Sequence, residues 1–259
     1  MTKGHHPKSL RARVRLFCFP HAGAGPSCFR SWREKWQNTA DVVPVVLPGR
    51  EGRFTDEIPS NMDELVEYLA GSMPSDLHKP FAFLGHSMGG LVAFELARLM
   101  RRKNLPGPQH IFISAYGAPH LPTTRPPIHR LPDLLLRAEL LRLQGTPIEV
   151  LRDRDLLGLL MPVLRADLRI CENYSYRAEA PLSCAITCLG GLSDRRVSRI
   201  QMVAWKRHTT GPFRLRLFPG NHFFLYEKPD LVGEAIASEL KTAPSRVSDS
   251  SGGATTRDH

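Results

Sequence analysis

Apolar residues in this chain form short runs that alternate with longer stretches of helical spacing. The runs at 14–19, 42–47, 80–84, 110–115, 184–189 and 213–218 predict buried strands. Between them, apolar positions recur every three or four residues and predict helices over about 26–36, 61–73, 90–100, 197–207 and 230–240. This alternation predicts an α/β fold with a mostly parallel central sheet and helices on both faces.

The alternation stops after residue 117. Residues 118–132 contain five prolines, and helical patterns then follow at 131–143, 151–160 and 162–174 without a strand between them. Because these helices are rich in leucine, we interpret about 118–177 as a helical lid inserted over the carboxyl edge of the sheet. The alternative is a set of ordinary packing helices.

The length of 259 residues and the apolar fraction of 42% suit one large domain. We expect a flexible basic arm at 1–12, the folded domain at 13–241, and a disordered tail rich in Ser, Thr and Gly at 242–259. The five cysteines show no pairing typical of a metal site or disulfide, which favours free, mostly buried thiols. Neither a signal peptide nor an apolar run long enough to span a membrane is present, so we expect a soluble cytoplasmic protein.

Basic residues outnumber acidic ones, giving a formal net charge of +10, and they cluster in two places. Residues 1–53 hold ten Lys and Arg against three acids, and residues 195–216 hold seven without an acid. A basic surface attracts nucleic acid, an anionic membrane or an acidic protein. Because no nucleic-acid motif or interleaved aromatic residues accompany these clusters, we expect either a solvated surface or a docking face for an acidic partner.

The clearest chemical signal is the stretch 81–90, Phe-Ala-Phe-Leu-Gly-His-Ser-Met-Gly-Gly. It contains the Gly-x-Ser-x-Gly pattern, which places a serine at the apex of a tight turn between a strand and a helix. Gly85 and Gly89 relieve crowding around that strained turn, and the free N–H groups of the helix point to the space where an oxyanion forms. Ser87 is therefore the candidate nucleophile.

A serine nucleophile needs a base, and the base needs a carboxylate partner. His222 follows the last predicted strand, and Asp194 follows the strand before it. Because the carboxyl ends of parallel strands share one edge, both side chains can reach Ser87. Asp133 and Asp230 are poorer candidates, since the first lies far beyond its strand and the second lies inside the last helix. The order Ser87, Asp194, His222 is that of the α/β-hydrolase fold.

Two backbone N–H groups are expected to form the oxyanion hole. One belongs to Met88, the residue after the nucleophile, and the other to Ala22, in the loop after the first strand. Glycines in that loop let the backbone approach a substrate closely. His21 and His86 are expected to orient loops rather than to transfer protons.

Several motifs resemble those of type II thioesterases, the stand-alone editing enzymes of polyketide synthases and nonribosomal peptide synthetases. The resemblance covers about residues 14–240. Many esterases share the turn at Ser87, whereas the 47–51 turn and the lid motifs are more specific. The resembling segments are Phe19-Pro-His-Ala-Gly-Ala-Gly25, Leu47-Pro-Gly-Arg-Glu51, Phe83-Leu-Gly-His-Ser-Met-Gly-Gly90, His129-Arg-Leu-Pro-Asp133, Gly145-Thr-Pro147, Leu164-Arg-Ala-Asp167, Cys171-Glu-Asn-Tyr174 and Gly220-Asn-His-Phe-Phe224.

The resemblance implies a serine thioesterase that hydrolyses acyl thioesters from the phosphopantetheine arm of acyl or peptidyl carrier proteins, so that stalled synthases are regenerated. It implies no cofactor and no metal in the enzyme itself. Because carrier proteins are generally acidic, the docking surface is expected to be either the basic face at 195–216, with Arg195, Arg199 and Arg207 as candidate residues, or the basic N-terminal region. We expect a monomer that binds neither nucleic acid nor membrane, with the lid lining an acyl channel.

Other functions fit parts of the same pattern. Medium-chain thioesterases that work with animal fatty acid synthase share several of these motifs. A general carboxylesterase would keep the same three side chains but prefer oxygen esters. An inactive binding protein of this fold would typically have lost one of the three, and a cyclising terminal thioesterase would normally be attached to a carrier domain.

Overall fold

The computed structural model describes residues 14–36, 39–74, 77, 79–123, 125–143 and 148–242. At its centre lies a six-stranded sheet in the order β2-β1-β3-β4-β5-β6, and every neighbouring pair is parallel. All six predicted strands occur. They are β1 (Arg15–Phe19), β2 (Asp41–Pro44), β3 (Phe81–His86), β4 (His110–Ser114), β5 (Ala185–Gly191) and β6 (Phe213–Phe218).

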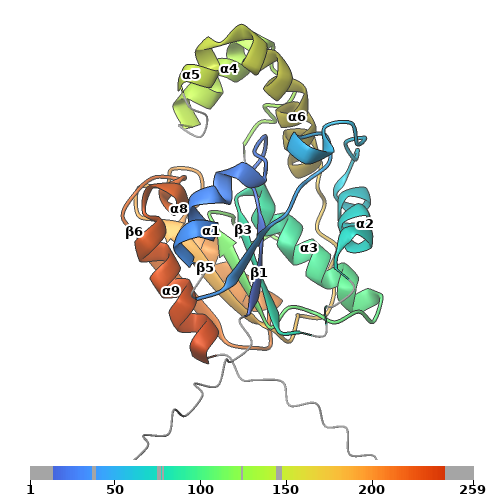
Figure 1. Cartoon of the computed structure of the whole chain (residues 1–259), viewed down its shortest axis with the longest axis vertical. Coiled ribbons are helices and arrows are strands. Elements are labelled where there is room, and N and C mark those ends of the chain that lie inside the picture. The colour runs from blue at the N-terminus through green and yellow to red at the C-terminus, as the bar shows by residue number, and fades with distance from the viewer. Residues whose placement is uncertain are drawn as a thin grey trace, which may run out of the picture.

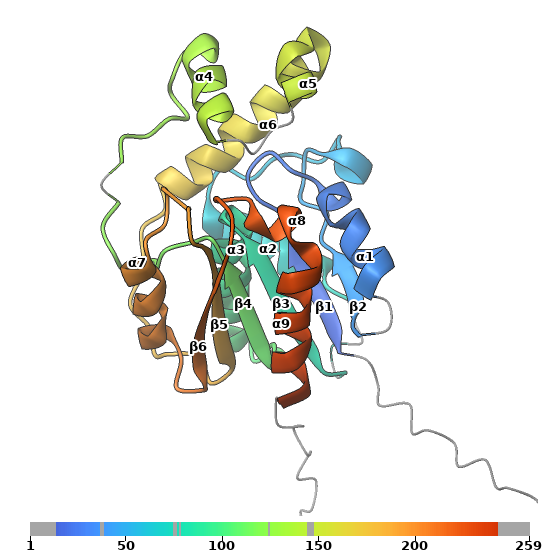
Figure 2. The same ribbon diagram turned by 90° about the vertical axis from the view of Figure 1, so that its left-hand side faces the viewer.

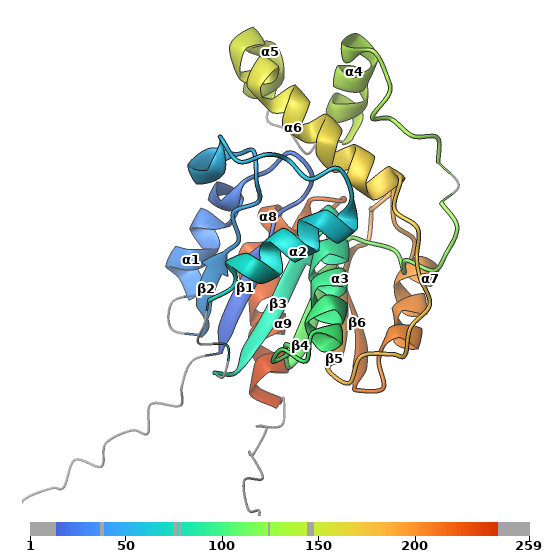
Figure 3. The ribbon, with the colours of Figure 1, turned by 90° about the vertical axis from the view of Figure 1, so that its right-hand side faces the viewer.

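Helices cover both faces of the sheet (Figures 2 and 3). Side chains alternate along each strand, so Phe17 and Phe83 pack in one apolar layer, whereas Leu16 and Leu84 pack in the other. The predicted α/β architecture is confirmed. The first layer includes α2 (Met62–Ser72), α3 (Met88–Arg102), α7 (Arg199–Val203) and the 3-10 helix η3 (Ala204–His208), and the second includes the 3-10 helix η1 (Pro26–Phe29), α1 (Arg30–Trp36), α8 (Phe224–Glu227) and α9 (Pro229–Thr242).

The lid helices stand above the carboxyl edge of the sheet (Figure 1). They are α4 (Asp133–Leu143), α5 (Ile148–Arg152) and α6 (Arg154–Glu172). The prediction of two helices separated at Pro162 was wrong, because α6 runs through this proline without interruption. Pro162 itself is exposed, and burial of Met161 and Leu164 beside it holds the helix together despite the missing N–H.

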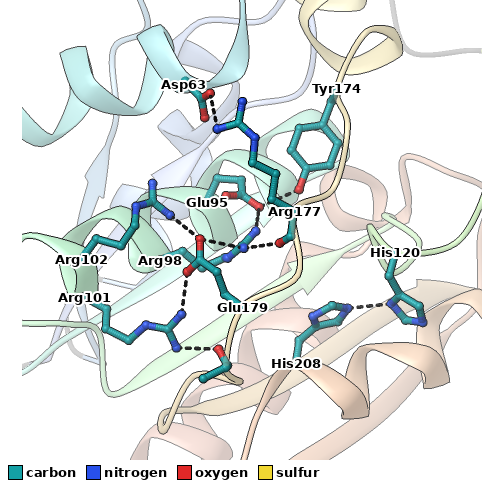
Figure 4. Close-up of polar contacts among 11 residues, drawn as sticks. Asp63, Glu95, Arg98, Arg101, Arg102, His120, Tyr174, Arg177, Glu179 and His208 are labelled. Atoms are coloured by element: carbon teal, nitrogen blue, oxygen red, sulfur yellow. Dashed lines mark hydrogen bonds and ion pairs between the residues drawn. The ribbon is translucent and has the colours of Figure 1, made fainter.

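Both connections between the lid and the body are anchored (Figure 4). On the returning segment, Glu179 forms ion pairs with Arg98 at 2.9 Å and Arg102 at 2.8 Å, both on α3. On the outgoing segment, His120 Nδ1 lies 2.7 Å from His208 Nε2. Burial is the main cause that lowers the pKa of His208 to about 4, so this histidine pair is neutral at neutral pH.

The predicted arm at 1–12, the motif at 145–147 and the tail beyond α9 lie outside the described residues. None of the described helices combines the length and apolar character that crossing a membrane requires. All five cysteines are free thiols and none is exposed, as predicted. The remaining element is the short 3-10 helix η2 (Glu51–Arg53), which lies between β2 and α2 in the chain.

Candidate active site

Ser87 occupies the sharp turn between β3 and α3. Its backbone has φ 52° and ψ −121°, a conformation that non-glycine residues rarely adopt. Its N–H donates to the carbonyl oxygen of Ser114 on β4 at 2.7 Å. A side chain at Gly85 would place its Cβ 2.0 Å from the carbonyl oxygen of Gly89, so the turn closes only with glycine at position 85.

The loop after β1 lies directly against this turn. A Cβ at Gly89 would lie 2.1 Å from the carbonyl oxygen of Phe19, the last residue of β1. Ala22 lies in this loop, and Met88 is the first residue of α3. Within the described ranges, neither the Ala22 nor the Met88 N–H donates a hydrogen bond. Both predicted oxyanion donors are therefore available to a substrate oxygen.

His222 lies in the turn between β6 and α8 and is buried. Its Nε2 lies 3.1 Å from Ser87 Oγ, and its Nδ1 lies 2.8 Å from Asp194 Oδ2. The loops after β5 and β6 pack closely, since a Cβ at Gly191 would lie 2.3 Å from the carbonyl oxygen of Asn221. The three side chains singled out in the sequence thus form one continuous hydrogen-bonded line.

The Asp194 carboxylate is held on both oxygens, and its side chain is only 1% exposed. Oδ1 accepts the N–H of Arg196 at 2.7 Å and of Val197 at 3.3 Å. Burial alone would raise the pKa of Asp194, but the hydrogen bond and charge of His222 and these two amides lower it below its ordinary value. An ionised carboxylate keeps the proton on His222 Nδ1, which leaves Nε2 free to accept the serine proton.

Two further histidines lie beside the site as neutral packing groups. Burial, reinforced by the charge of His222, lowers the pKa of His21 to about 3 and holds the pKa of His86 well below its ordinary value. His21 Nδ1 lies 3.0 Å from the hydroxyl of Tyr226, and His86 Nδ1 lies 2.9 Å from Ser114 Oγ. Their rings therefore fix the orientation of neighbouring loops.

The two rejected candidate acids are engaged elsewhere. Asp133 pairs with Arg165 at 2.5 Å on the lid. Asp230 pairs with Lys35 at 2.9 Å, where α9 meets α1. Each carboxylate thus has its own cationic partner away from the turn at Ser87.

The candidate docking residues follow one another along the segment from the loop of Asp194 to the amino end of β6, with Arg195 in that loop, Arg199 on α7 and Arg207 on η3. Arg195, Arg199 and Arg207 are exposed, and none of them forms an ion pair with another described residue. The two arginines of β6 instead pair with Glu239 at 3.0 and 2.9 Å. The unpaired part of the basic cluster is therefore concentrated on α7, η3 and the loop that precedes them.

One buried ion pair near the site was not predicted. Arg50 and Asp167 form a bidentate pair, with side chains 6% and 1% exposed. Asp167 lies three residues after Leu164 and four before Cys171, on the apolar face of α6. A carboxylate on an apolar face of a helix is the signal that could have indicated a buried partner.

No group of three or more His, Cys, Asp or Glu side chains in the described part of the chain is arranged to hold a metal ion. The available chemistry is a strained serine beside an imidazole, with an ionised carboxylate behind it and two unpaired amides nearby. Such an arrangement can form an acyl-serine ester and then hydrolyse it.

A family model described as a thioesterase domain matches residues 14–241. The chain belongs to the thioesterase family. Gramicidin S biosynthesis protein GrsT of Aneurinibacillus migulanus is 40% identical over 230 residues, which is 89% of this chain and 90% of the relative. The structure of the type II thioesterase BorB from the borrelidin biosynthetic cluster is 34% identical with a TM-score of 0.80, covering 91% of this chain and 94% of that chain.

The thioesterase is thus a hydrolase of thioesters with the α/β-hydrolase fold, as predicted, and type II thioesterases are among its close relatives. The medium-chain S-acyl fatty acid synthase thioesterase of Rattus norvegicus is 36% identical over 228 residues, covering 85% of this chain and 84% of the relative. Because GrsT is more similar to this thioesterase, the medium-chain fatty acyl activity remains the lesser alternative.

Proposed function

We propose that this thioesterase hydrolyses acyl thioesters on the phosphopantetheine arm of carrier proteins, and so clears stalled peptide or polyketide synthases. The observation that carries the proposal is the line from Asp194 through His222 to Ser87, with contacts of 2.8 and 3.1 Å, in a chain of the thioesterase family. These residues supply nucleophile, base and orienting carboxylate, so the reaction needs no metal or organic cofactor.

In the proposed mechanism, Ser87 Oγ attacks the thioester carbonyl carbon while its proton passes to His222 Nε2. The carbonyl oxygen becomes an oxyanion that accepts hydrogen bonds from the N–H groups of Met88 and Ala22. The carbon–sulfur bond then breaks, and His222 returns the proton to the thiolate, which leaves readily because a thiol has a pKa of about 8.5. His222 then takes a proton from a water molecule as this water attacks the acyl-serine carbonyl carbon, and it returns the proton to Ser87 Oγ as the bond between the acyl carbon and Oγ breaks and the acid is released.

Docking of the carrier is assigned to the basic surface that runs from the Asp194 loop along α7 to η3, with Arg195, Arg199 and Arg207. These arginines are exposed, and the side chain of Ile200 between them is 81% exposed. An acidic partner surface with an apolar contact of its own would match this combination of charge and apolar area.

The acyl chain is proposed to bind beneath the lid. Ala22 packs against the apolar cluster of the lid, which brings the proposed oxyanion donor next to leucine side chains. The lid also carries apolar surface that is exposed to water and available for contact with an acyl chain. Four leucines of α4 and α6 are between 47% and 74% exposed: Leu134, Leu135, Leu156 and Leu159.

The test of the proposed function compares three substrates: an acetyl-carrier, a long-acyl-carrier and a simple oxygen ester. Ser87→Ala should lower hydrolysis of both carrier thioesters on the order of 10³-fold or more. Ser72→Ala, at the exposed end of α2, is the matched control and should retain activity. Near-normal turnover by Ser87→Ala would remove the mechanism, and faster hydrolysis of the oxygen ester would favour a carboxylesterase.

A second experiment tests the docking surface. Arg199→Glu with Arg207→Glu should raise KM for a carrier-bound substrate about tenfold but leave a free acyl-pantetheine unaffected. The control, Arg30→Glu with Arg33→Glu on α1, changes the net charge equally at the other edge of the sheet. Equal effects on carrier-bound and free substrate, or an equal effect of the control, would contradict docking at this surface.

A further inference from the structure

Asp167 joins three segments that are far apart in the sequence. Its Oδ2 accepts the Gly23 N–H at 2.7 Å and Arg50 Nη1 at 2.6 Å, while Oδ1 accepts Arg50 Nη2 at 2.8 Å. The carboxylate therefore connects lid helix α6, the turn after β2 and the loop after β1. At 1% exposure, it makes these contacts away from water.

Arg50 holds the same loop at a second point. Its Nη1 also donates to the carbonyl oxygen of Ala24 at 3.2 Å, and its Nε donates to the carbonyl oxygen of Pro48 at 3.2 Å. One buried ion pair thus fixes both the N–H of Gly23 and the carbonyl of Ala24. The loop after β1 cannot shift without breaking charge-assisted hydrogen bonds.

The two neighbours of Ala22 are both restrained. Gly23 has φ +79°, and a Cβ there would lie 3.0 Å from Leu164 on α6, so the lid helix packs directly on the loop. On the other side, His21 is held by the hydroxyl of Tyr226 at 3.0 Å. The unpaired N–H of Ala22 therefore lies between two fixed residues.

We propose that Arg50 and Asp167 are positioning residues that fix the Ala22 N–H for the oxyanion, so that lid helix α6 completes the oxyanion hole. The inference rests on the proposed function, because it requires Ala22 to be an oxyanion donor. Preorganised donors stabilise the transition state because they need not reorganise during the reaction. Neither charged side chain takes part in the chemistry, since each acts through the loop.

A purely structural ion pair makes different predictions. Replacing both partners of a buried pair by apolar residues of similar size is often neutral or stabilising. The double variant Arg50→Met/Asp167→Leu should therefore recover most of the melting temperature lost in a single variant. It should not recover activity, because Gly23 and Ala24 have lost the groups that hold them.

The experiment uses the full chain with a small acyl-pantetheine substrate. Asp167→Asn and the double variant should each lower kcat about 10- to 100-fold with little change in KM. Labelling of Ser87 by a fluorophosphonate, whose phosphoryl oxygen needs the same donors, should slow by the same factor. Arg50→Lys, which keeps the charge, should retain more activity than Arg50→Met. Asp133→Asn, which removes an exposed ion pair of the lid, is the matched control and should leave kcat unchanged.

The inference is overturned if the double variant turns over like wild type, or if the variants lower only the melting temperature. Should Asp167→Asn fail to fold, the double variant still decides the question. Absence of thioesterase activity in wild type, or full activity in Ser87→Ala, would instead refute the proposed function.

Discussion

Replacing Asp194 by asparagine isolates the role of its charge. The asparagine Oδ1 can still accept the N–H groups of Arg196 and Val197, which lie 2.7 and 3.3 Å from the present oxygen, so the loop after β5 should keep its shape. The new Nδ2 would face His222 Nδ1 across 2.8 Å and must donate to it. The imidazole proton then moves to Nε2, which can no longer accept the proton of Ser87.

The expected loss can be worked out from the geometry. The imidazolium and carboxylate charges, about 4 Å apart at an effective dielectric of about 20, attract one another by about 4 kcal/mol. The wild-type enzyme gains this attraction only as His222 becomes charged, so the loss appears in kcat rather than in KM. At 1.36 kcal/mol for each factor of ten, kcat should fall about 10³-fold.

The assay follows thiol release from an acyl-pantetheine substrate, with thermal denaturation to confirm folding. Asp230→Asn is the matched control, because it removes a carboxylate that pairs with Lys35 at 2.9 Å on the surface, and its rate should stay close to wild type. A folded Asp194→Asn enzyme with kcat within about threefold of wild type would refute the assignment of Asp194 as the group that orients His222.

Three further predictions concern other parts of the fold. Gly89→Ala puts a Cβ 2.1 Å from the Phe19 carbonyl oxygen, so the loop after β1 must shift and kcat should fall on the order of 10²-fold; a folded variant with normal kinetics would contradict this close approach. Burial lowers the pKa of His208 from 6.5 to about 4. Between these pH values the unfolded chain binds more protons than the folded protein, so the stability contributed by neutral His208 is lost as pH falls from 6.5 towards 4. His208→Gln should therefore show a smaller fall in melting temperature between pH 7 and pH 4.5 than wild type, and equal falls would refute the assignment. Pro162→Ala should raise the free energy of unfolding in urea by about 1 kcal/mol because α6 gains a hydrogen bond at an exposed position; an unchanged or lower value would show that proline fits α6 without cost.

Features with local causes could be predicted from the sequence. The glycines around Ser87 indicated the strained turn, and Asn61 accepts the N–H of Glu64 at the start of α2, as expected for a helix cap. The meeting of Asp194 and His222 also followed from a simple rule, because parallel strands end at a common edge. In each case a short pattern and its position in the strand order were sufficient.

Features that depend on packing between distant segments could not be predicted. Pro162 suggested a helix break, yet burial of the lid cluster on either side outweighed the local preference. The pairing of Arg50 with Asp167 depends on how α6 lies against the loop after β1. No periodicity in either segment contains that information, although a carboxylate on an apolar helix face indicates that some partner exists.

The anchoring of α6 at Asp167 has a consequence for anyone who wishes to change the acyl preference of this enzyme. A change of lid sequence that moves or replaces Asp167 would leave the Arg50 guanidinium and the Gly23 N–H buried without their acceptor. The part of the lid before Pro162 carries the exposed leucines and is free of that constraint. A chimera that takes its lid sequence from a relative should therefore exchange only residues before Pro162. The rest of α6, including Asp167, then keeps its contacts with the body of the enzyme.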